Sequence, residues 1–473
     1  MTQHLHTSLG QLHAWLPHSR LIGDPSLKVS RIHTDSRSLL PGDLFIALKG
    51  DRFDGHDFLG QLNDQGVGAA IASHGLKEAG LMGLEVADTL KALGELSHAW
   101  RSQFSIPLIA VTGSNGKTTV TQMIASILSA WKGDESLATQ GNFNNAIGLP
   151  LTLLRLQAHH RSAVVELGMN HAGEIAELAS LASPTVALVN NAQREHQEFL
   201  HSVQAVAAEN GEVIAALPSN GIAVFPAEDT YTALWRKLTG TRQVMCFGRS
   251  VAADVQLIHS AWSNHQWQLS IQTPMGKLAT SLSVAGEHNV HNALAAIACA
   301  LAAKVPLAFI EQGIASFKPV NGRSRSIILK WADRQLLLID DSYNANPDSV
   351  RAAINVLAQS TQPRLLVLGD MGEVGTQGAE FHAEVGRYAQ ASGIEHLITL
   401  GELSRDTAKA FSNAKHCQSI DEVYAQVQAR LPMVETVLVK GSRFMRMERV
   451  VQAIQTWVNS RSSSSNTTEV PCS

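Results

Sequence analysis

The sequence predicts an α/β protein with mostly parallel sheets, divided among several domains. Short β-branched apolar runs alternate with segments of helical periodicity over most of the chain, which is the pattern of parallel strands connected by helices. Loops rich in Gly, Asp, Asn or Ser follow these runs, and in open α/β sheets ligands bind at the carboxyl ends of the strands. Because 473 residues are too many for one hydrophobic core, we expect two to four domains.

The middle and last thirds of the chain contain the apolar runs that we expect to be buried strands. These runs are Leu108–Val111, Ala163–Glu166, Val186–Asn190, Leu336–Ile339, Leu365–Leu368, Leu397–Leu400 and Val437–Val439. Domain boundaries are expected near Ile106 and Lys318, which divides the chain into residues 1–105, 106–318 and 319–459. The first of these segments is a smaller α/β unit. Residues 460–473 are polar and low in complexity, so we expect a disordered tail there.

The composition excludes several classes of protein. The net charge of −4 gives no electrostatic reason to bind nucleic acid or an anionic membrane. The four cysteines lie far apart without a CxxC pair, which is typical of a reducing compartment. The N-terminus lacks the features of a signal peptide, and the most apolar helical stretch, Ala293–Ala303, is too short to span a bilayer. We therefore expect a cytoplasmic monomer that binds no nucleic acid and is not inserted in a membrane.

The strongest single motif is IPLIAVTGSNGKTT, residues 106–119, where an apolar run ends in a glycine-bounded loop before a helical pattern. Strand, glycine loop, Lys-Thr and helix together form the context of a phosphate-binding loop. Gly113 and Gly116 would let backbone N–H groups approach phosphate oxygens. Lys117 would reach the β and γ phosphates, and the Thr118 hydroxyl would ligate Mg²⁺. The alternative is a glycine-rich turn with an ordinary surface lysine.

Polar residues follow the next two expected strands. Glu166 ends the run SAVVELGM, and a carboxylate beside a phosphate site suits Mg²⁺, which prefers oxygen ligands; a solvated glutamate is the alternative. His196 follows TVALVNN, and because imidazole is an unusual ligand for Mg²⁺, residue chemistry alone favours a hydrogen-bonded loop histidine. Asn144 and Asn145 belong to the cluster TQGNFNNAIGLP, which is either turn chemistry or a set of amide donors for a polar substrate.

Two segments near the second boundary also carry polar groups. GEHNVHNALAAIACAL, residues 286–301, has an alanine-rich helical pattern after a polar start. Close helix packing explains the alanines but not the polar residues at the start. An asparagine such as Asn292 can both donate a hydrogen bond to an adenine edge and accept one from it. NGRSR, residues 321–325, offers guanidinium groups for phosphate, or is an exposed basic linker.

The densest group of hydrogen-bonding side chains is in LLLIDDSYNANPDS, residues 336–349. So many polar groups at one strand end are costly unless they bind something. VLVKGSRFMRME repeats the arrangement at another strand, where Lys440 and Arg443 could receive a carboxylate. Near the N-terminus, Ser36 and Arg37 in RIHTDSR are, taken alone, a surface loop.

Together these motifs resemble the Mur ligases of peptidoglycan synthesis, over about residues 34–448. TGSNGKTT, the strand ending at Glu166, the GEHNVHNALAA helix and NGRSR are shared across that family. DSYNANP, followed by GDMGEVG and VKGSR, is the pattern of the members that add D-alanyl-D-alanine. Amino-acid-adding members carry a DxxH-type segment at that place, and one of them has a DNPR signature that this sequence lacks.

The resemblance implies three domains: an N-terminal UDP-binding α/β domain, a central P-loop ATPase domain and a C-terminal Rossmann-like domain. It implies ATP and Mg²⁺ as cofactors, and UDP-N-acetylmuramoyl-tripeptide and D-alanyl-D-alanine as substrates. The terminal carboxylate of the tripeptide would attack the γ-phosphate of ATP, and the amine of the dipeptide would attack the resulting acyl phosphate. Both meso-diaminopimelate and L-lysine fit as the third residue of the peptide.

The resemblance also implies roles for individual residues. At ATP it places Gly113, Ser114, Asn115, Gly116, Lys117, Thr118 and Thr119 on the phosphates, Asn292 on adenine, and Arg323 and Asp341 on phosphate and ribose. The implied Mg²⁺ ligands are Thr118, Glu166 and His196, and the implied catalytic residues are Lys117, Glu166 and His196. The implied substrate-binding residues are Ser36 and Arg37 for the UDP-sugar, together with Asn144, Asn145, Asn344, Asn346, Lys440 and Arg443.

Asn210 departs from the family pattern. Family members commonly have a lysine in an AKGE-like stretch, carbamylated to bind a second Mg²⁺, whereas this sequence reads AENGE. An amide side chain cannot react with CO₂, so no carbamate is expected here. We expect Glu209 or Glu212 to supply the missing charge, although in a helix Glu209 would point about 100° away from Asn210.

Other interpretations stay open. A different Mur ligase would share most of these motifs. Folylpolyglutamate synthase shares the ATPase core but would lack the N-terminal DSR and GDLFIAL unit. From another class, a nucleotide-dependent switch protein would not need the polar grouping in the last third of the chain.

Overall fold

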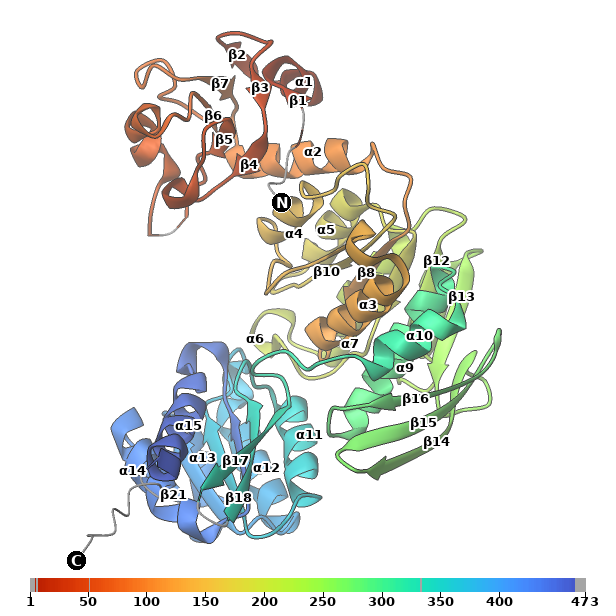
Figure 1. Ribbon diagram of the computed structural model, residues 1–473, viewed down its shortest axis with the longest axis vertical. Helices are drawn as coiled ribbons and strands as arrows, with labels where there is room; N and C mark the ends of the chain where they lie inside the picture. Colours follow the sequence, from red (N-terminus) through yellow and green to blue (C-terminus); the bar gives the residue numbers. More distant parts are fainter. Residues whose placement is uncertain (1–4, 6, 51, 332–333, 464–473) are drawn as a thin grey trace, which may run out of the picture.

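The structure is a computed structural model that describes residues 5, 7–50, 52–331 and 334–463. Three α/β domains follow one another along the chain and lie on an arc, with the N-terminal domain at the top of Figure 1 and the C-terminal domain at the bottom. Each domain has its own main sheet, and the boundaries expected near Ile106 and Lys318 fall between these sheets. Within the described ranges, no helix combines the length and apolarity that crossing a membrane requires.

The N-terminal domain packs helices α1 (Leu9–Trp15) and α2 (Thr89–Arg101) with a mixed sheet. Its strands are β1 (Thr7–Ser8), β2 (Arg20–Ile22), β3 (Lys28–Val29), β4 (Arg31–His33), β5 (Asp43–Ile46), β6 (Ala69–Ala72) and β7 (Met82–Glu85). The sheet order is β2-β7-β6-β5-β4, with β2 antiparallel to β7 and the other neighbours parallel. Every residue of β5 and β6 is buried, as expected where a parallel sheet is covered on both faces.

Helix α2 connects this domain to the central one. Leu93 and Leu96 fill the N-terminal core. At the end of the helix, Trp100 Nε1 donates to the carbonyl oxygen of Leu156 at 3.1 Å, and Arg101 Nε donates to that of Ala182 at 3.1 Å. The helix therefore belongs to one core and is anchored to the next domain by its last turn.

The central domain contains the sheet order β16-β15-β14-β13-β12-β11-β8-β10-β9. Its strands are β8 (Leu108–Thr112), β9 (Ser136–Ala138), β10 (Ser162–Glu166), β11 (Val186–Val189), β12 (Ile222–Pro226), β13 (Gln243–Gly248), β14 (Val255–Ser263), β15 (Gln266–Thr273) and β16 (Gly276–Leu282). Its helices are α3 (Lys117–Lys132), α4 (Gly148–Leu153), α5 (Glu174–Ala182), α6 (Gln197–Leu200), α7 (Val203–Ala215), α8 (Thr232–Thr239), α9 (Glu287–Ala302) and α10 (Leu307–Ala315). The ladders are parallel from β9 to β14 and antiparallel from β14 to β16. Because β8 lies between β10 and β11, the loops that follow these three strands meet at one edge.

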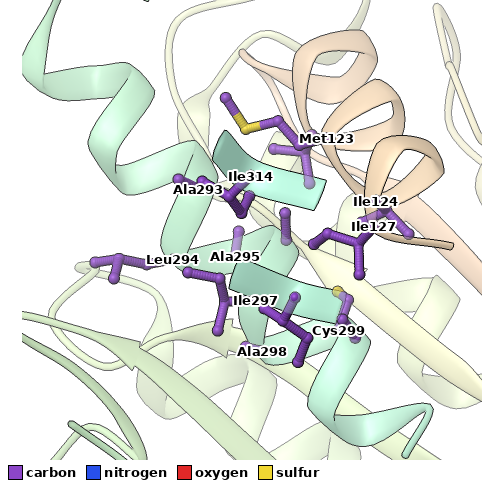
Figure 2. Packing of buried hydrophobic residues seen from close by; sticks show 14 of the residues in the cluster. Met123, Ile124, Ile127, Ala293, Leu294, Ala295, Ile297, Ala298, Cys299 and Ile314 are labelled. Carbon is purple, nitrogen blue, oxygen red and sulfur yellow. The ribbon is translucent and has the colours of Figure 1, made fainter. Parts of the chain in front are cut away.

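Small residues allow the helices on one face of this sheet to pack closely. Figure 2 shows Met123, Ile124 and Ile127 of α3 beside the alanine-rich helix α9 and Ile314 of α10. A Cβ atom at Gly313 would lie only 2.3 Å from the Cα atom of Ile127, so α10 can approach α3 this closely only with glycine there. The alanines of α9 are therefore core-packing residues, as the sequence predicted.

The C-terminal domain has the sheet order β17-β18-β22-β19-β20-β21, parallel except that β17 is antiparallel to β18. Its strands are β17 (Arg325–Trp331), β18 (Arg334–Asp341), β19 (Arg364–Gly369), β20 (His396–Leu400), β21 (Lys415–Cys417) and β22 (Thr436–Lys440). Its helices are α11 (Pro347–Ala358), α12 (Gly378–Ala391), α13 (Ser404–Lys409), α14 (Ile420–Arg430) and α15 (Glu448–Ser463). Apolar clusters fill both faces of the sheet.

The expected strands of the middle and last thirds are all present as β8, β10, β11, β18, β19, β20 and β22. The expected start of the disordered tail is wrong, because α15 continues through residues 460–463. The rest of that expected tail, residues 464–473, lies outside the described residues.

Candidate active site

A cavity of about 1330 Å³ lies between the central and C-terminal domains. The loops that follow β8, β10 and β11 line it from one side, and the loops that follow β18 and β22 line it from the other. Most residues expected at a site line this cavity: Ser114, Asn115, Gly116, Lys117, Thr118, Thr119, Asn144, Asn145, Glu166, His196, Asn292, Arg323, Asp341, Asn344, Asn346, Lys440 and Arg443. The structure thus brings together motifs up to 330 residues apart in the sequence.

Gly113 does not line this cavity, although the six residues that follow it do. Ser36 and Arg37 are not part of it either. They lie in the short 3-10 helix η1 (Ser36–Ser38) of the N-terminal domain. The Arg37 guanidinium is largely exposed and forms an ion pair with Asp35 at 2.7 Å. Their assignment to a UDP-sugar site stays a prediction.

The glycines of the phosphate-binding loop adopt backbone conformations that other residues avoid. Gly113 has φ of +134° and Gly116, the N-cap of α3, has φ of +85°. A Cβ atom at Gly116 would lie 2.4 Å from Oδ1 of Asn292, so the loop packs directly on an amide side chain of α9. The loop therefore ends at the N-terminus of α3, where backbone N–H groups and the helix dipole favour an anion.

Lys117 is held among oxygen atoms at the start of α3. Its Nζ donates to the carbonyl oxygens of Gly113 at 2.7 Å and Ser114 at 3.1 Å, and it lies 3.3 Å from Oε2 of Glu195. Glu195 is 8% exposed; burial raises the pKa of its carboxyl, and the positive charge of Lys117 opposes that shift. Sequence reasoning missed Glu195, although the run REH directly after an apolar strand placed ionisable residues at the site edge.

Two orphaned oxygen atoms fit a Mg²⁺ ion at this loop. Among the described residues, neither Oγ1 of Thr118 nor Oε2 of Glu166 has a hydrogen-bond partner, and both are buried. The other Glu166 oxygen accepts from Nδ2 of Asn144 at 2.7 Å, which orients the carboxylate. Within the described chain, no group of three or more His, Cys, Asp or Glu side chains is arranged to hold a metal alone. Mg²⁺ is commonly bound by one or two protein oxygens together with substrate phosphates and water, so Thr118 and Glu166 fit that chemistry.

His196 bridges the two domains. Its Nδ1 lies 2.6 Å from Oε2 of Glu373 in the C-terminal domain, and its Nε2 lies 3.7 Å from Oε2 of Glu195. The contact with His196 lowers the pKa of Glu373. His196 therefore lies between two carboxylates, although its buried Nδ1 makes no hydrogen bond of good geometry among the described residues. Both the hydrogen-bonded histidine that residue chemistry favoured and the metal-ligand role implied by the family resemblance stay predictions.

Neither Asn210 nor its acidic neighbours line the cavity. Asn210 is fully buried on α7, and its Oδ1 accepts from Oγ1 of Thr112 at 2.6 Å. Both oxygens of Glu209 accept backbone N–H bonds at the start of α5, from Gly173 and Ile175 at 2.9 Å. The expectation that Glu209 replaces a carbamate is therefore wrong, because both oxygens of its carboxylate cap a helix and Glu209 does not line the cavity.

We predict that activity does not depend on bicarbonate. An amide nitrogen does not form a stable carbamate with CO₂, and the Asn210 amide is enclosed in the protein core. Rates measured in degassed buffer with and without added bicarbonate should agree within error, and the intact mass under native conditions should show no 44 Da adduct. A bicarbonate-dependent rate, or a carbamylated lysine in the mass spectrum, would contradict the prediction.

Asn292 belongs to a chain of amides beneath the phosphate-binding loop. Its Oδ1 accepts from Nδ2 of Asn190 at 3.0 Å, and its Nδ2 donates to Oδ1 of Asn289 at 3.1 Å. The same Asn190 nitrogen donates to the carbonyl oxygen of Asn115 at 2.8 Å. Asn292 thus supports the loop backbone, and its contact with adenine stays a prediction.

The C-terminal side of the cavity contains a buried ion pair. Nζ of Lys440 lies 2.6 Å from Oδ2 of Asp341 and also donates to the carbonyl oxygen of Asn344 at 2.8 Å. Lys440 is 4% exposed and is paired with Asp341 in this structure, and its expected contact with a substrate carboxylate stays a prediction. Arg323 and Arg443 lie over the ring of Tyr343, with guanidinium carbons 4.1 and 5.6 Å from its centroid. These two guanidinium groups line the cavity where that carboxylate was expected.

Asn145 and Asn346 stabilise helix starts. Oδ1 of Asn145 accepts from the backbone nitrogen of Gly148 at the start of α4, and Asn346 forms a capping box with Ser349 at the start of α11. Asn346 also donates from Nδ2 to Oδ1 of Asn115 at 2.9 Å. This bond joins the DSYNANP loop of one domain to the phosphate-binding loop of the other.

A third connection between the domains, made by Arg194, was not foreseen from the sequence. Arg194 Nη2 lies 2.6 Å from Oδ1 of Asp348, and Nη1 lies 2.7 Å from Oε2 of Glu384. The Arg194 guanidinium also lies over the ring of Phe381. Its hydrogen bonds raise the pKa of Arg194 and lower that of Glu384, which means that both groups are charged when the domains are docked.

A phosphate-binding loop that faces a second α/β domain across one cavity defines the class of ATP-dependent ligases. Comparison with known families agrees with this class. The Mur ligase family catalytic domain matches residues 28–101, the Mur ligase middle domain matches 111–300, and the Mur ligase glutamate ligase domain matches 327–443. The chain belongs to the Mur ligase family.

Individual relatives cover almost the whole chain. The UDP-N-acetylmuramoyl-tripeptide–D-alanyl-D-alanine ligase of Escherichia coli is 41% identical over 91% of this chain and 94% of its own. The ligase of the same name from Haemophilus influenzae is 37% identical over 92% and 96%. A crystal structure of MurF from Acinetobacter baumannii superposes with a TM-score of 0.90 at 34% identity, over 96% of this chain and all of that one.

Proposed function

We propose that this enzyme joins D-alanyl-D-alanine to UDP-N-acetylmuramoyl-tripeptide and converts ATP to ADP and phosphate, acting as a monomer in the cytoplasm. The observation that carries the proposal is the bond between Asn115 and Asn346. It places the phosphate-binding loop against the DSYNANP loop at one cavity, and relatives with that substrate name match over nine tenths of the chain.

In this proposal the central domain activates the tripeptide carboxylate. That carboxylate and the triphosphate repel one another, so the reaction needs positive charge at the γ-phosphate. Lys117 supplies it from the start of α3, where it already sits among oxygen atoms. Thr118 and Glu166 would hold Mg²⁺, which would neutralise further phosphate charge when bound.

The C-terminal domain presents the amine of the dipeptide to the acyl phosphate. Lys440 and Arg443 line the cavity on that side, and the Arg443 guanidinium is suited to bind the dipeptide carboxylate, while Arg323 keeps its expected role at the ATP phosphates. Docking through Arg194 and His196 closes the domain over the loop. Closure matters because water would otherwise hydrolyse the acyl phosphate.

The alternatives fit less well. Folylpolyglutamate synthase was expected to lack the N-terminal unit, whereas residues 28–101 of this chain match the Mur ligase family description. A switch protein would need no second domain that lines the nucleotide cavity with guanidinium groups.

A phosphate-release assay tests the proposal. We expect almost no release with ATP alone, and release only when a UDP-MurNAc-tripeptide and D-alanyl-D-alanine are both present, with the meso-diaminopimelate and L-lysine tripeptides assayed separately. Mass spectrometry should find the UDP-MurNAc-pentapeptide. Equal or faster turnover with a folate and glutamate, or with a single amino acid on a shorter UDP-peptide, would overturn the assignment.

A further inference from the structure

A carboxylate that the reaction described above does not use lies beside the phosphate-binding loop, in the loop that follows β11. Glu195 lines the cavity and is 8% exposed. One of its oxygens, Oε2, lies 3.3 Å from Nζ of Lys117, whereas Oε1 has no hydrogen-bond partner among the described residues. A buried carboxylate is stable only with a positive or hydrogen-bonding partner, and here that partner is the lysine expected to bind ATP.

Nucleotide binding takes this partner away. When Lys117 turns to the β and γ phosphates, Glu195 is left as a buried carboxylate beside a polyanion, and of its two ion-pair partners in the described chain only His196, whose Nε2 lies 3.7 Å from Oε2, remains. Two unit charges of the same sign repel strongly at such distances inside a protein. Unless a cation replaces Lys117 at Glu195 or the carboxyl takes up a proton, the carboxylate opposes nucleotide binding.

We propose that Glu195 exchanges Lys117 for a divalent cation when nucleotide binds, and so acts as an additional carboxylate ligand beside Thr118 and Glu166. Three buried oxygens without partners line the same cavity: Oε1 of Glu195, Oε2 of Glu166 and Oγ1 of Thr118. Hard cations such as Mg²⁺ prefer carboxylate oxygen near phosphates. This inference rests on the proposed function only in that it requires ATP binding.

The two glutamates that flank Asn210, Glu209 and Glu212, do not line the cavity and so do not supply a carboxylate to a cation there. Asn210 is bonded to Thr112, and Glu209 caps α5. Glu195 therefore offers a charge that the AENGE stretch does not bring to the cavity.

The test compares nucleotide binding with and without Mg²⁺ in the full-length protein. Isothermal titration calorimetry with a non-hydrolysable ATP analogue gives a Kd in EDTA and a Kd in excess Mg²⁺ for wild type, Glu195→Gln and Glu198→Gln. Glu198 is an exposed glutamate on the same segment and does not line the cavity, so it controls for net charge. The assay contains no peptide substrate, so its outcome does not depend on whether ligation takes place.

We expect Glu195→Gln to bind the metal-free analogue more tightly than wild type, because the repulsion is gone. It should bind the Mg²⁺ complex more weakly, because a ligand is gone. The Kd in EDTA divided by the Kd in Mg²⁺ should fall at least about tenfold in Glu195→Gln, the lower end of the loss in metal affinity when a group around a metal site is removed. Glu198→Gln should keep the wild-type ratio. An unchanged ratio in Glu195→Gln overturns the proposal. If the nucleotide affinity rises by the same factor with and without Mg²⁺, the ratio is unchanged and Glu195 only holds Lys117.

A second comparison keeps the proposal testable if Glu195→Gln folds poorly. In the nucleotide-free protein, Lys117 and a divalent cation compete for Glu195. Mn²⁺ titration followed by electron paramagnetic resonance should show tighter binding to Lys117→Met than to wild type, and the Lys117→Met/Glu195→Gln double variant should lose that gain. Equal Mn²⁺ affinity in wild type and Lys117→Met would contradict the exchange.

Discussion

A Lys117→Ala variant is expected to lose ligation almost completely. Lys117 is the first residue of α3, and its ammonium lies between the carbonyl oxygens of the loop and Glu195. Loss of a preorganised charge at a developing anion typically costs about 3–4 kcal/mol, or roughly 10²–10³-fold in kcat. Steady-state phosphate release with both co-substrates measures the effect.

Two controls separate chemistry from folding in this variant. Lys132→Ala removes the same charge from the far end of α3, where the ammonium lies over Trp131, and its ligation rate should stay within about twofold of wild type.

The second control concerns stability. Since Lys117→Ala leaves Glu195 buried without its cation, the thermal midpoint of this variant should fall, and Lys117→Ala/Glu195→Gln should recover stability but not activity. A folded Lys117→Ala enzyme with more than about a tenth of the wild-type kcat/KM, a loss near 1.4 kcal/mol, would remove Lys117 from the mechanism.

An Arg194→Met variant is expected to weaken docking of the C-terminal domain. Arg194 is about three-quarters buried and bonds both Asp348 and Glu384 across the domain boundary. Removing it leaves Asp348 without that partner, and truncating a buried charge pair costs about 2–5 kcal/mol. Because this pair is partly exposed, we expect about 1–3 kcal/mol, seen as a 10- to 100-fold drop in kcat/KM for D-alanyl-D-alanine.

Arg351 provides the matched control for this prediction. It also bonds Glu384, at 2.8 Å, but it lies on α11 within the C-terminal domain. Arg351→Met should therefore change kcat/KM for the dipeptide much less than Arg194→Met. Small-angle scattering should show a larger radius of gyration for Arg194→Met alone. Equal behaviour of the two variants would mean that Arg194 does not hold the domains together.

Much of the fold could be predicted from the sequence, because each parallel strand here is a short apolar run followed by polar residues. Strands β8, β10 and β11 were predicted within about a residue, and β18, β19, β20 and β22 lie where expected. The helical end of the chain was missed because NSRSS has a composition typical of disorder, while α15 is held by apolar residues earlier in the helix, such as Ile454 and Val458.

The cavity was predicted less completely, since its contacts depend on where side chains meet in space. Because β22 lies beside β18, the ammonium of Lys440 is paired with Asp341, a contact that the sequence did not predict, and its role toward a substrate carboxylate stays a prediction. Glu209 was expected at a metal, but its position on α7 directs it to the N-terminus of α5. Arg194 and Glu195 gave only the signal of a charged run after a strand, and their partners lie in other segments of the chain.

The segment from residue 193 to 198 alternates its contacts between two domains. Gln193 and Glu195 bond Ser114 and Lys117 of the phosphate-binding loop, whereas Arg194 and His196 bond residues of the C-terminal domain. Because Gln193 is bonded to Ser114 of the loop, a nucleotide that orders the loop also orders the side chains on which the C-terminal domain docks. By thermodynamic reciprocity, docking must then strengthen nucleotide binding by the same factor that nucleotide strengthens docking. The Arg194→Met enzyme should accordingly bind ATP more weakly, although its lost bonds are to Asp348 and Glu384 rather than to the loop.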